Sequence, residues 1–220
     1  MTSAGLSTTE RLVAASPIWV RLRDTFTGRR PAGPLVVRLQ RRSGSTWEPF
    51  AYPHRISASG DLALVNLGRT SDPAGIGSFD VRVAVGCPGM IPETAAGDAF
   101  VTTTVAAWAP EAPPRPTEPQ LLRFFPGPAY AYPAGLPLLA GRVVDPAGAP
   151  VARVRVSAST TVLGTARVEE ARTDPAGFFR LPLRWFAGAT DVTAALGGLS
   201  AVITVSVPAE LSITQQITLT

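Results

Sequence analysis

Acid–base catalysis by carboxylates needs two acidic side chains that reach the same substrate. The chain has one pair of adjacent acids, Glu169 and Glu170, in the stretch ARVEEART (166–173). This stretch has the pattern of a strand, and neighbouring residues of a strand face opposite sides of a sheet. The two carboxylates therefore cannot share one substrate, and we expect a solvated strand here instead of a catalytic pair.

Other reactive side chains occur singly or are absent. All 20 basic residues are arginines, which excludes a Schiff-base lysine, a phosphate-loop lysine and a lysine–asparagine isopeptide bond. Cys87 has no second cysteine for an internal disulfide, and His54 has no further Cys or His ligands with which to hold zinc. We predict that Cys87 is a small core or turn residue and that His54 lies in a loop or at a strand edge. The sequence thus predicts a non-enzymatic protein with no catalytic residue, no metal and no cofactor.

The arginines are better candidates for binding, because seven of them crowd the segment 21–42. The net charge is only +4 and no nucleic-acid-binding motif is recognisable, so we do not expect nucleic acid as the partner. A guanidinium group also forms bidentate contacts to carboxylates across protein interfaces. We therefore expect a protein partner, with Arg29, Arg30, Arg41 and Arg42 as candidate contacts.

Aromatic residues offer a second set of candidates. Phe124, Phe125, Tyr130 and Tyr132 lie in a proline-rich stretch that we do not expect to be an ordinary central strand. This stretch would either dock onto a partner or pack back onto its own module, and we favour the second interpretation. The tyrosines and the four tryptophans would also provide stacking faces for a glycan, namely Trp19, Trp47, Trp108 and Trp185.

The elements that position these residues are short strands. The 22 prolines and 20 glycines supply many stops, and from Ile18 onward β-branched or alternating runs lie between turn residues. Ile18, Val20 and Leu22 alternate with polar or mixed residues, which predicts a half-buried strand. Closely spaced prolines at about 108–120 predict an extended spacer, so we place a first β-sandwich at 17–107 and a linker at 108–136.

The remainder, 137–220, contains seven β-like segments, a number that suits a sandwich. The last of them, 211–220, alternates apolar and polar residues without charge. An uncharged edge strand of this kind would pair with another chain or close the second sandwich, and we favour closure.

The N-terminal segment 1–16 has no basic start followed by an apolar run, so no secretory signal is predicted. No stretch is long enough to span a membrane. We therefore expect a cytoplasmic location. Ser7 to Glu10 fit a capping box, which predicts a short helix ending near Ala15.

An internal repeat links the two halves. Leu22–Leu39 parallels Val143–Val156, Ser59–Leu64 parallels Asp174–Leu181, and Phe79–Val83 parallels Thr190–Ala194. The first copy carries an additional loop, Gly68–Gly77, which is too polar and glycine-rich to be core. The conserved order of these landmarks predicts a duplicated topology.

Two turns carry a family resemblance. Gly141–Val151 contains a strand that ends in an Asp-x-x-Gly turn followed by proline, and Thr173–Leu183 opens the next strand with Thr-Asp-x-x-Gly-x-Phe. In both turns we expect Asp to cap the turn, Gly to adopt a positive φ and Pro to fix the exit. The second half thereby resembles the carboxypeptidase-regulatory-like, or transthyretin-like, β-sandwich domains. The first half lacks the second motif and is linked to the family through the repeat.

The resemblance implies an all-β fold of two tandem antiparallel β-sandwiches, transthyretin-like or Ig-like, joined by a Pro-rich linker and preceded by a short helix. Hydroxyisourate hydrolases and intradiol dioxygenases have related sandwiches, but both need more than one active-site histidine, and this chain has only His54.

The tandem sandwiches and the arginine- and alanine-rich composition look similar to accessory proteins of phage-tail-like contractile injection systems in bacteria. This resemblance implies a structural cap or accessory component, with copies of itself or other particle subunits as partners. The alternative is a carbohydrate- or surface-binding module.

Overall fold

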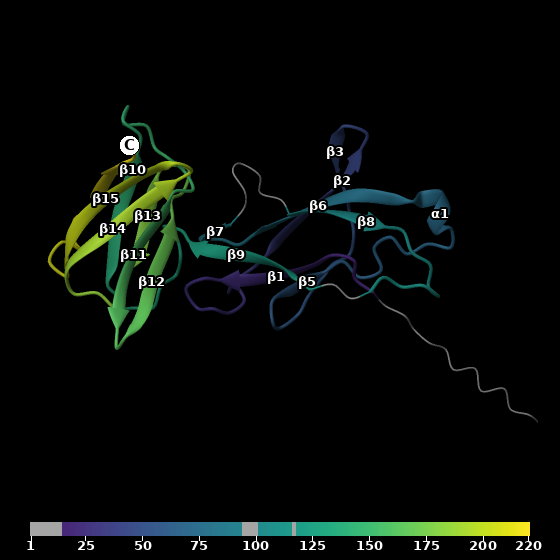
Figure 1. Cartoon of the computed structure of the whole chain (residues 1–220), viewed down its shortest axis with the longest axis horizontal. Coiled ribbons are helices and arrows are strands. Elements are labelled where there is room, and N and C mark those ends of the chain that lie inside the picture. The colour runs from purple at the N-terminus through teal and green to yellow at the C-terminus, as the bar shows by residue number, and fades with distance from the viewer. Residues whose placement is uncertain (1–14, 94–100, 116–117) are drawn as a thin grey trace, which may run out of the picture.

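The computed structural model describes residues 15–93, 101–115 and 118–220, and nearly all of its regular structure is β-sheet (Figure 1). Four sheets are present among these residues, two in the first half (up to residue 126) and two in the second half (from residue 137). The helix α1 is a single turn at Pro73–Ile76. Its N-terminus is capped by Asp72, whose side chain accepts a hydrogen bond from the Gly75 amide at 3.0 Å.

The first half consists of two sheets. The β1 sheet has the order β4–β5–β1–β9–β7 and is formed by β4 (Arg55–Ile56), β5 (Asp61–Ala63), β1 (Trp19–Asp24), β9 (Gln120–Pro126) and β7 (Met90–Pro92). The β2 sheet has the order β3–β2–β6–β8 and is formed by β3 (Thr46–Pro49), β2 (Val36–Ser43), β6 (Ser78–Gly86) and β8 (Val101–Ala106).

The second half also consists of two sheets. The β10 sheet has the order β13–β10–β16 and is formed by β13 (Phe178–Pro182), β10 (Leu138–Val144) and β16 (Gln215–Thr218). The β11 sheet has the order β12–β11–β14–β15 and is formed by β12 (Thr165–Arg172), β11 (Arg155–Val162), β14 (Gly188–Leu196) and β15 (Leu199–Val207).

Both halves follow one strand order. The order β5–β1–β9 matches β13–β10–β16, and β3–β2–β6–β8 matches β12–β11–β14–β15. The matched strands also come in the same sequence along the chain, while β4, β7 and α1 are additional to the first half. The two halves therefore share the strand order that a duplicated topology predicts. In the additional loop at 68–77 the one helix is α1, and none of its residues is buried.

The prediction of purely antiparallel sheets was wrong at two positions. β9 pairs with β1 in parallel, from Val20 opposite Gln120 to Asp24 opposite Phe124. β16 pairs with β10 in parallel in the same way. In each half the last strand returns from the other sheet and runs in the direction of the first strand. Such crossovers join residues far apart in the chain, so hairpin-scale patterns do not reveal them.

Each half has its own hydrophobic core, and both of its sheets contribute to that core. In β1 the apolar residues Val20 and Leu22 are 1% exposed, whereas Arg21 and Arg23 face solvent. This confirms the predicted half-buried strand. In the second half Leu139, Val143 and Leu181 from the β10 sheet meet residues of the β11 sheet, and all three have no exposed surface.

The proline-rich segment 108–136 was predicted to be a linker, but part of it forms a strand. Residues 120–126 form β9, which lies between β1 and β7 and is therefore a central strand. Phe124 has no exposed surface and belongs to the core of the first half. The proline of this strand, Pro126, is its last residue, where it pairs with Met90 at the start of the short edge strand β7. Proline is tolerated at such a strand end, and so β9 can occupy the centre of the sheet.

The turns have the predicted chemistry. Asp145 Oδ1 accepts hydrogen bonds from the amides of Ala147 and Ala149, and Gly148 has φ = 82°. Asp174 Oδ1 accepts from the amides of Ala176 and Phe178. In both turns the Asp side chain bonds to amides two and four residues further along the chain.

Other predicted elements have different outcomes. The seven β-like segments of the second half correspond to β10 to β16. β16 closes the β10 sheet against β10, as favoured for the C-terminal segment. The predicted N-terminal helix lies outside the described residues. Within the described ranges, no helix has the length and hydrophobicity needed to cross a bilayer.

Gly141 lets two strands and a ring approach one another closely in the second core. A Cβ atom at this position would overlap the Phe179 ring and lie 2.8 Å from the Gln215 carbonyl oxygen. We predict that Gly141→Ala lowers the free energy of unfolding by about 1–3 kcal/mol through overpacking, measured by denaturant titration. Gly198→Ala is the matched control, because open space surrounds that position. Equal stability of the two variants would contradict the role of Gly141.

Candidate functional site at the junction of the two halves

The strand β9 contacts both halves of the molecule. Successive residues of a strand point to opposite faces of its sheet, so Phe124 and Phe125 point in opposite directions. Phe124 enters the first core, while Phe125 is 2% exposed and lies under the guanidinium group of Arg172, 4.7 Å from its ring centroid. Arg172 belongs to β12 in the second half. Burial lowers the pKa of this arginine, which agrees with its position between the halves.

Three aromatic rings from the turn after β1 and from the segment after β9 lie close together. Phe26, in the turn after β1, lies 5.6 Å from Tyr130 and 5.1 Å from Tyr132 between ring centroids, and the two tyrosines lie 4.7 Å apart. All three pairs are edge-to-face, an arrangement that aromatic quadrupoles favour. The rings come from the first half and from the connection between the halves, and we call them the aromatic cluster.

A buried carboxylate holds the aromatic cluster to β1. Asp24 is 1% exposed and accepts hydrogen bonds from the Phe26 amide at 2.8 Å, the Thr27 hydroxyl at 2.9 Å and the Tyr130 hydroxyl at 2.7 Å. Burial, together with the bond to Asp24, raises the pKa of Tyr130. Tyr130 therefore remains a protonated donor at neutral pH, and its hydroxyl compensates part of the cost of burying the Asp24 charge.

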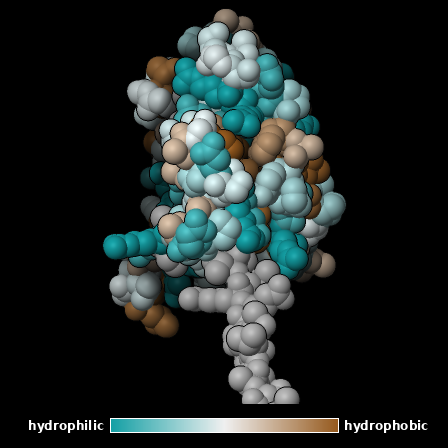
Figure 2. Space-filling model, turned by 90° about the vertical axis from the view of Figure 1, so that its right-hand side faces the viewer, coloured by the Kyte–Doolittle hydropathy of each residue, from teal (hydrophilic) through white to brown (hydrophobic). Residues whose placement is uncertain are grey.

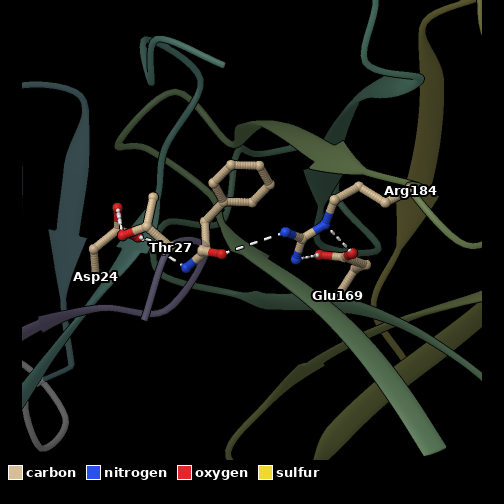
Figure 3. A network of polar contacts seen from close by, with 5 residues as sticks. Asp24, Thr27, Glu169 and Arg184 are labelled. Carbon is tan, nitrogen blue, oxygen red and sulfur yellow. Dashed lines mark hydrogen bonds and ion pairs between the residues drawn. The ribbon is translucent and has the colours of Figure 1, made fainter. Parts of the chain in front are cut away.

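An ion pair on the second half completes the junction (Figure 3). Glu169 is 2% exposed and receives two hydrogen bonds from Arg184, at 2.5 Å and 2.8 Å. The same guanidinium group donates to the Phe26 carbonyl oxygen at 3.4 Å and lies 4.3 Å from the Phe26 ring centroid. Arg184 thus joins a carboxylate of the second half to the aromatic cluster.

The prediction of a solvated strand at Glu169 and Glu170 was wrong for Glu169. The two residues do face opposite sides of β12, as expected, and Glu170 pairs with Arg155 near the surface. Glu169 instead points inward, where Arg184 supplies a bidentate partner. Burying a charge is costly unless its hydrogen bonds are satisfied, and the partner that satisfies Glu169 lies 15 residues further along the chain.

Tyr132 ties the connection between the halves to the second half. Its hydroxyl donates to the Arg180 carbonyl oxygen at 2.9 Å, and Arg180 donates to the Pro128 carbonyl oxygen at 3.3 Å. The Arg180 guanidinium group also lies 5.6 Å from the Tyr132 ring. Residues of both halves therefore contact the segment 127–132, and these contacts hold the segment in place.

The structure separates the eight candidate residues into distinct places. Phe124 and Phe125 are buried, and Tyr130 and Tyr132 are half-buried in the junction, so the aromatic residues pack within the chain. Pairing of β9 with β1 buries Phe124, and hydrogen bonds to Asp24 and to the Arg180 carbonyl oxygen hold Tyr130 and Tyr132 in the junction. This is the packing interpretation that we favoured.

The four arginines remain at the surface but do not gather into one site. Arg29 and Arg30 lie in the loop after β1, whereas Arg41 and Arg42 lie on β2 in the other sheet. Arg30 donates to the Ser57 carbonyl oxygen at 3.4 Å, and Arg42 pairs with Asp80 at 3.3 Å. The Arg41 guanidinium group lies 4.4 Å from the Phe79 ring.

Cys87 is 6% exposed, as expected of a core or turn residue, and His54 lies in an exposed loop. Burial raises the pKa of the Cys87 thiol, which disfavours the reactive thiolate. Among the described residues, no three Cys, His, Asp or Glu side chains lie close enough to hold a metal ion.

Sequence reasoning missed Phe26, Arg172 and Arg184 as junction residues. The repeat aligns Asp24 with Asp145 and so indicated a turn cap, which Asp24 is. No sequence signal indicated that this cap would be buried beneath Tyr130.

The Tyr130 hydroxyl gives one prediction for the junction. Tyr130→Phe leaves a buried carboxylate short of one donor, and we expect it to lower the free energy of unfolding by about 1.5–3 kcal/mol. Tyr132→Phe is the matched control, because its hydroxyl donates to a neutral carbonyl oxygen and its loss should cost only about 0.5–1.5 kcal/mol. Chemical denaturation of both variants measures the difference, and the reverse order of the two costs would refute this account of Asp24.

Acid stability gives a second prediction. Hydrogen bonds from Arg21 and the Ser59 hydroxyl lower the pKa of Asp61. Because the folded-state pKa lies below the unfolded value near 4, this stabilisation is present above about pH 4 and is lost as the pH falls through the lowered pKa.

We expect Arg21→Gln to lose less stability than the wild type between about pH 6 and pH 2, measured by denaturant titration at each pH. Arg29→Gln, an exposed arginine outside this pair, should keep the wild-type acid dependence. An unchanged acid dependence in Arg21→Gln would exclude the pair as its source.

Comparison with known proteins agrees with the second-half motifs. No curated protein matches the chain. Residues 139–220 match the model of the carboxypeptidase regulatory-like domain family. This range spans β10 to β16 apart from the first residue of β10. The turns at Asp145 and Asp174 predicted this resemblance.

Proposed function

We propose that this chain is a non-catalytic structural protein in which two β-sandwich modules stand in tandem at a fixed relative orientation and present surfaces to protein partners. The observation that carries the proposal is the junction. Rings, a buried ion pair and hydrogen bonds from both halves converge on Phe26 and on the segment 127–132.

A flexible tether between two binding modules would not need these contacts. Domains joined by small polar interfaces move relative to one another by default. Here Arg184 and Tyr132 each make directional contacts across the junction, and directional contacts restrict rotation more than apolar packing alone does. A fixed angle suits a component that must place one module relative to another in an assembly.

The chemistry of the carboxylates supports a non-catalytic role. Asp145 and Asp174 cap turns, Glu169 is held by Arg184, and Asp24 accepts hydrogen bonds from four donors. None of these four is placed as a free general base. The family model that matches the second half describes a regulatory-like domain, in line with an interaction module.

The setting that we propose is a particle assembled inside the cell, of the phage-tail-like contractile kind, with the chain as a cap or accessory subunit. The support is the sequence resemblance stated above, and the partners would be copies of the chain or other particle subunits. The end of the first half that faces away from the second half suits polar contacts, because hydrophilic residues cover much of the part not drawn in grey and hydrophobic residues are scattered among them (Figure 2).

A carbohydrate-binding role is the alternative, and Trp185 is the residue on which it rests. Trp185 is 46% exposed, whereas Trp108 is 4% exposed and Trp47 lies under the Arg82 guanidinium group. Arg167 and Arg184 lie 5.5 Å and 5.9 Å from the Trp185 ring, so guanidinium groups already occupy space that a sugar would need. Glycan-array binding that is lost on Trp185→Ala would favour this alternative.

Size-exclusion chromatography with multi-angle light scattering tests the proposed function. We expect the purified chain, alone or mixed with extract of its source, to form a defined oligomer or to enter a large particle with identified subunits. A monomer that enters no assembly would refute the structural role.

The junction gives a further prediction. Arg184→Ala leaves Glu169 buried without its partner, and we expect a loss of about 3 kcal/mol in the free energy of unfolding together with a broader distribution of orientations in small-angle X-ray scattering. Arg167→Ala removes a neighbouring exposed arginine and should change neither property. Unchanged scattering from a folded Arg184→Ala protein would show that the ion pair does not fix the orientation.

A further inference from the structure

The outer face of the β1 sheet carries an unusual concentration of arginine. Strand alternation directs Trp19, Arg21 and Arg23 of β1 outward, and the parallel register places Leu121 beside Arg21 and Arg123 beside Arg23. Arg55 of β4 pairs with Ala63 of β5, and Ala63 pairs with Trp19 of β1. Paired residues share a face of the sheet, so Arg55 lies on the same face as Trp19. We call these six residues the arginine face, namely Trp19, Arg21, Arg23, Arg55, Leu121 and Arg123.

Positive charge on this face is only partly neutralised. Arg21 pairs with Asp61 at 2.8 Å, and Arg123 lies 3.8 Å from Glu93. Among the residues that the structure describes, no carboxylate pairs with Arg23, although Arg123 is its direct neighbour across the strands. Like charges directly opposite one another in a sheet are destabilising. The register therefore places two positive charges side by side. Carboxylates from outside the chain would reduce the repulsion between them.

An apolar patch lies between the arginines. Leu121 is 48% exposed and Trp19 is half-buried, and both share the face with Arg21 and Arg123. Tryptophan and arginine are the residue types that most often dominate binding energy at protein interfaces, where they surround a desolvated centre. Arg side chains in such positions bind carboxylates in a bidentate geometry.

On these observations we propose that the arginine face is a docking surface for an acidic protein partner, whose carboxylates pair with Arg23 and Arg123 around an apolar contact at Leu121. This inference rests on the proposed function and specifies the surface and the chemistry of the partner. The partner is a protein because Asp61 and Glu93 are interspersed among the arginines. These carboxylates would repel the continuous phosphates of nucleic acid or of an anionic membrane.

A pair of double variants tests the proposal. Arg23→Gln with Arg123→Gln removes two charges from the arginine face. The β2 variant combines Arg38→Gln with Arg167→Gln, which removes the same charge from exposed positions on β2 and β12, outside the arginine face. The probe is a peptide of alternating glutamate and leucine, with a lysine–leucine peptide of equal length and a DNA duplex as comparisons. Binding is followed by NMR through the backbone amide signals of β1 and β9 and the Trp19 indole signal.

We expect the glutamate–leucine peptide to shift the signals of β1 and β9, to bind more weakly as salt is added, and to lose about tenfold in affinity in the Arg23→Gln/Arg123→Gln protein. The β2 variant should bind as the wild type does.

Thermal stability distinguishes binding from a structural role. Removal of the like-charged pair should leave the melting temperature unchanged or raise it, whereas removal of structural arginines would lower it.

Three results would overturn the proposal: equal binding of the DNA duplex at the same residues, equal binding of the lysine–leucine peptide, or loss of binding in the β2 variant alone.

Light scattering separates this inference from the proposed function. An assembly that forms normally with the Arg23→Gln/Arg123→Gln protein would refute the arginine face and leave the structural role standing. Peptide binding by a protein that enters no assembly would refute the structural role and leave the arginine face standing.

Discussion

The parallel pairing of β9 with β1 is the constraint on which the rest of the molecule depends. It seals the first core with Phe124, and strand alternation then directs Phe125 toward the second half, under Arg172. A shift of the register by one residue would exchange these two environments, because the side chains of a strand alternate between faces. One strand therefore links the packing of the first half to the placement of the second.

The junction uses charged groups where a simpler interface would use apolar ones. Burying Asp24 and Glu169 is costly, and full hydrogen bonding offsets that cost without any certain net gain in stability. What the charges supply is direction. Arg184 donates two hydrogen bonds to Glu169, and the same guanidinium group lies over the Phe26 ring. Through its contacts to Phe26, Arg184 joins the ion pair of the second half to the first half.

The use of arginine in place of lysine throughout the chain agrees with these contacts. The planar guanidinium group pairs with carboxylates through two bonds and also stacks on rings. Both uses are found here, at Glu169 with Arg184 and at Phe125 with Arg172, and stacking recurs at Phe79 with Arg41. A lysine ammonium group would provide the charge but neither the fork nor the flat face.

The sequence by itself determined the strands, the turns and the repeat, because these depend on residues close together in the chain. Asp145 and Asp174 bond to amides two and four residues away, so their turn chemistry can be read locally. Tertiary structure alone decided that β9 is a central parallel strand, that Glu169 is buried and that Tyr130 covers Asp24. Tyr130 lies 106 residues from Asp24 along the chain, and no local pattern records a partner at that distance. Burial and pairing depend on what packs across the chain, which only the folded arrangement establishes.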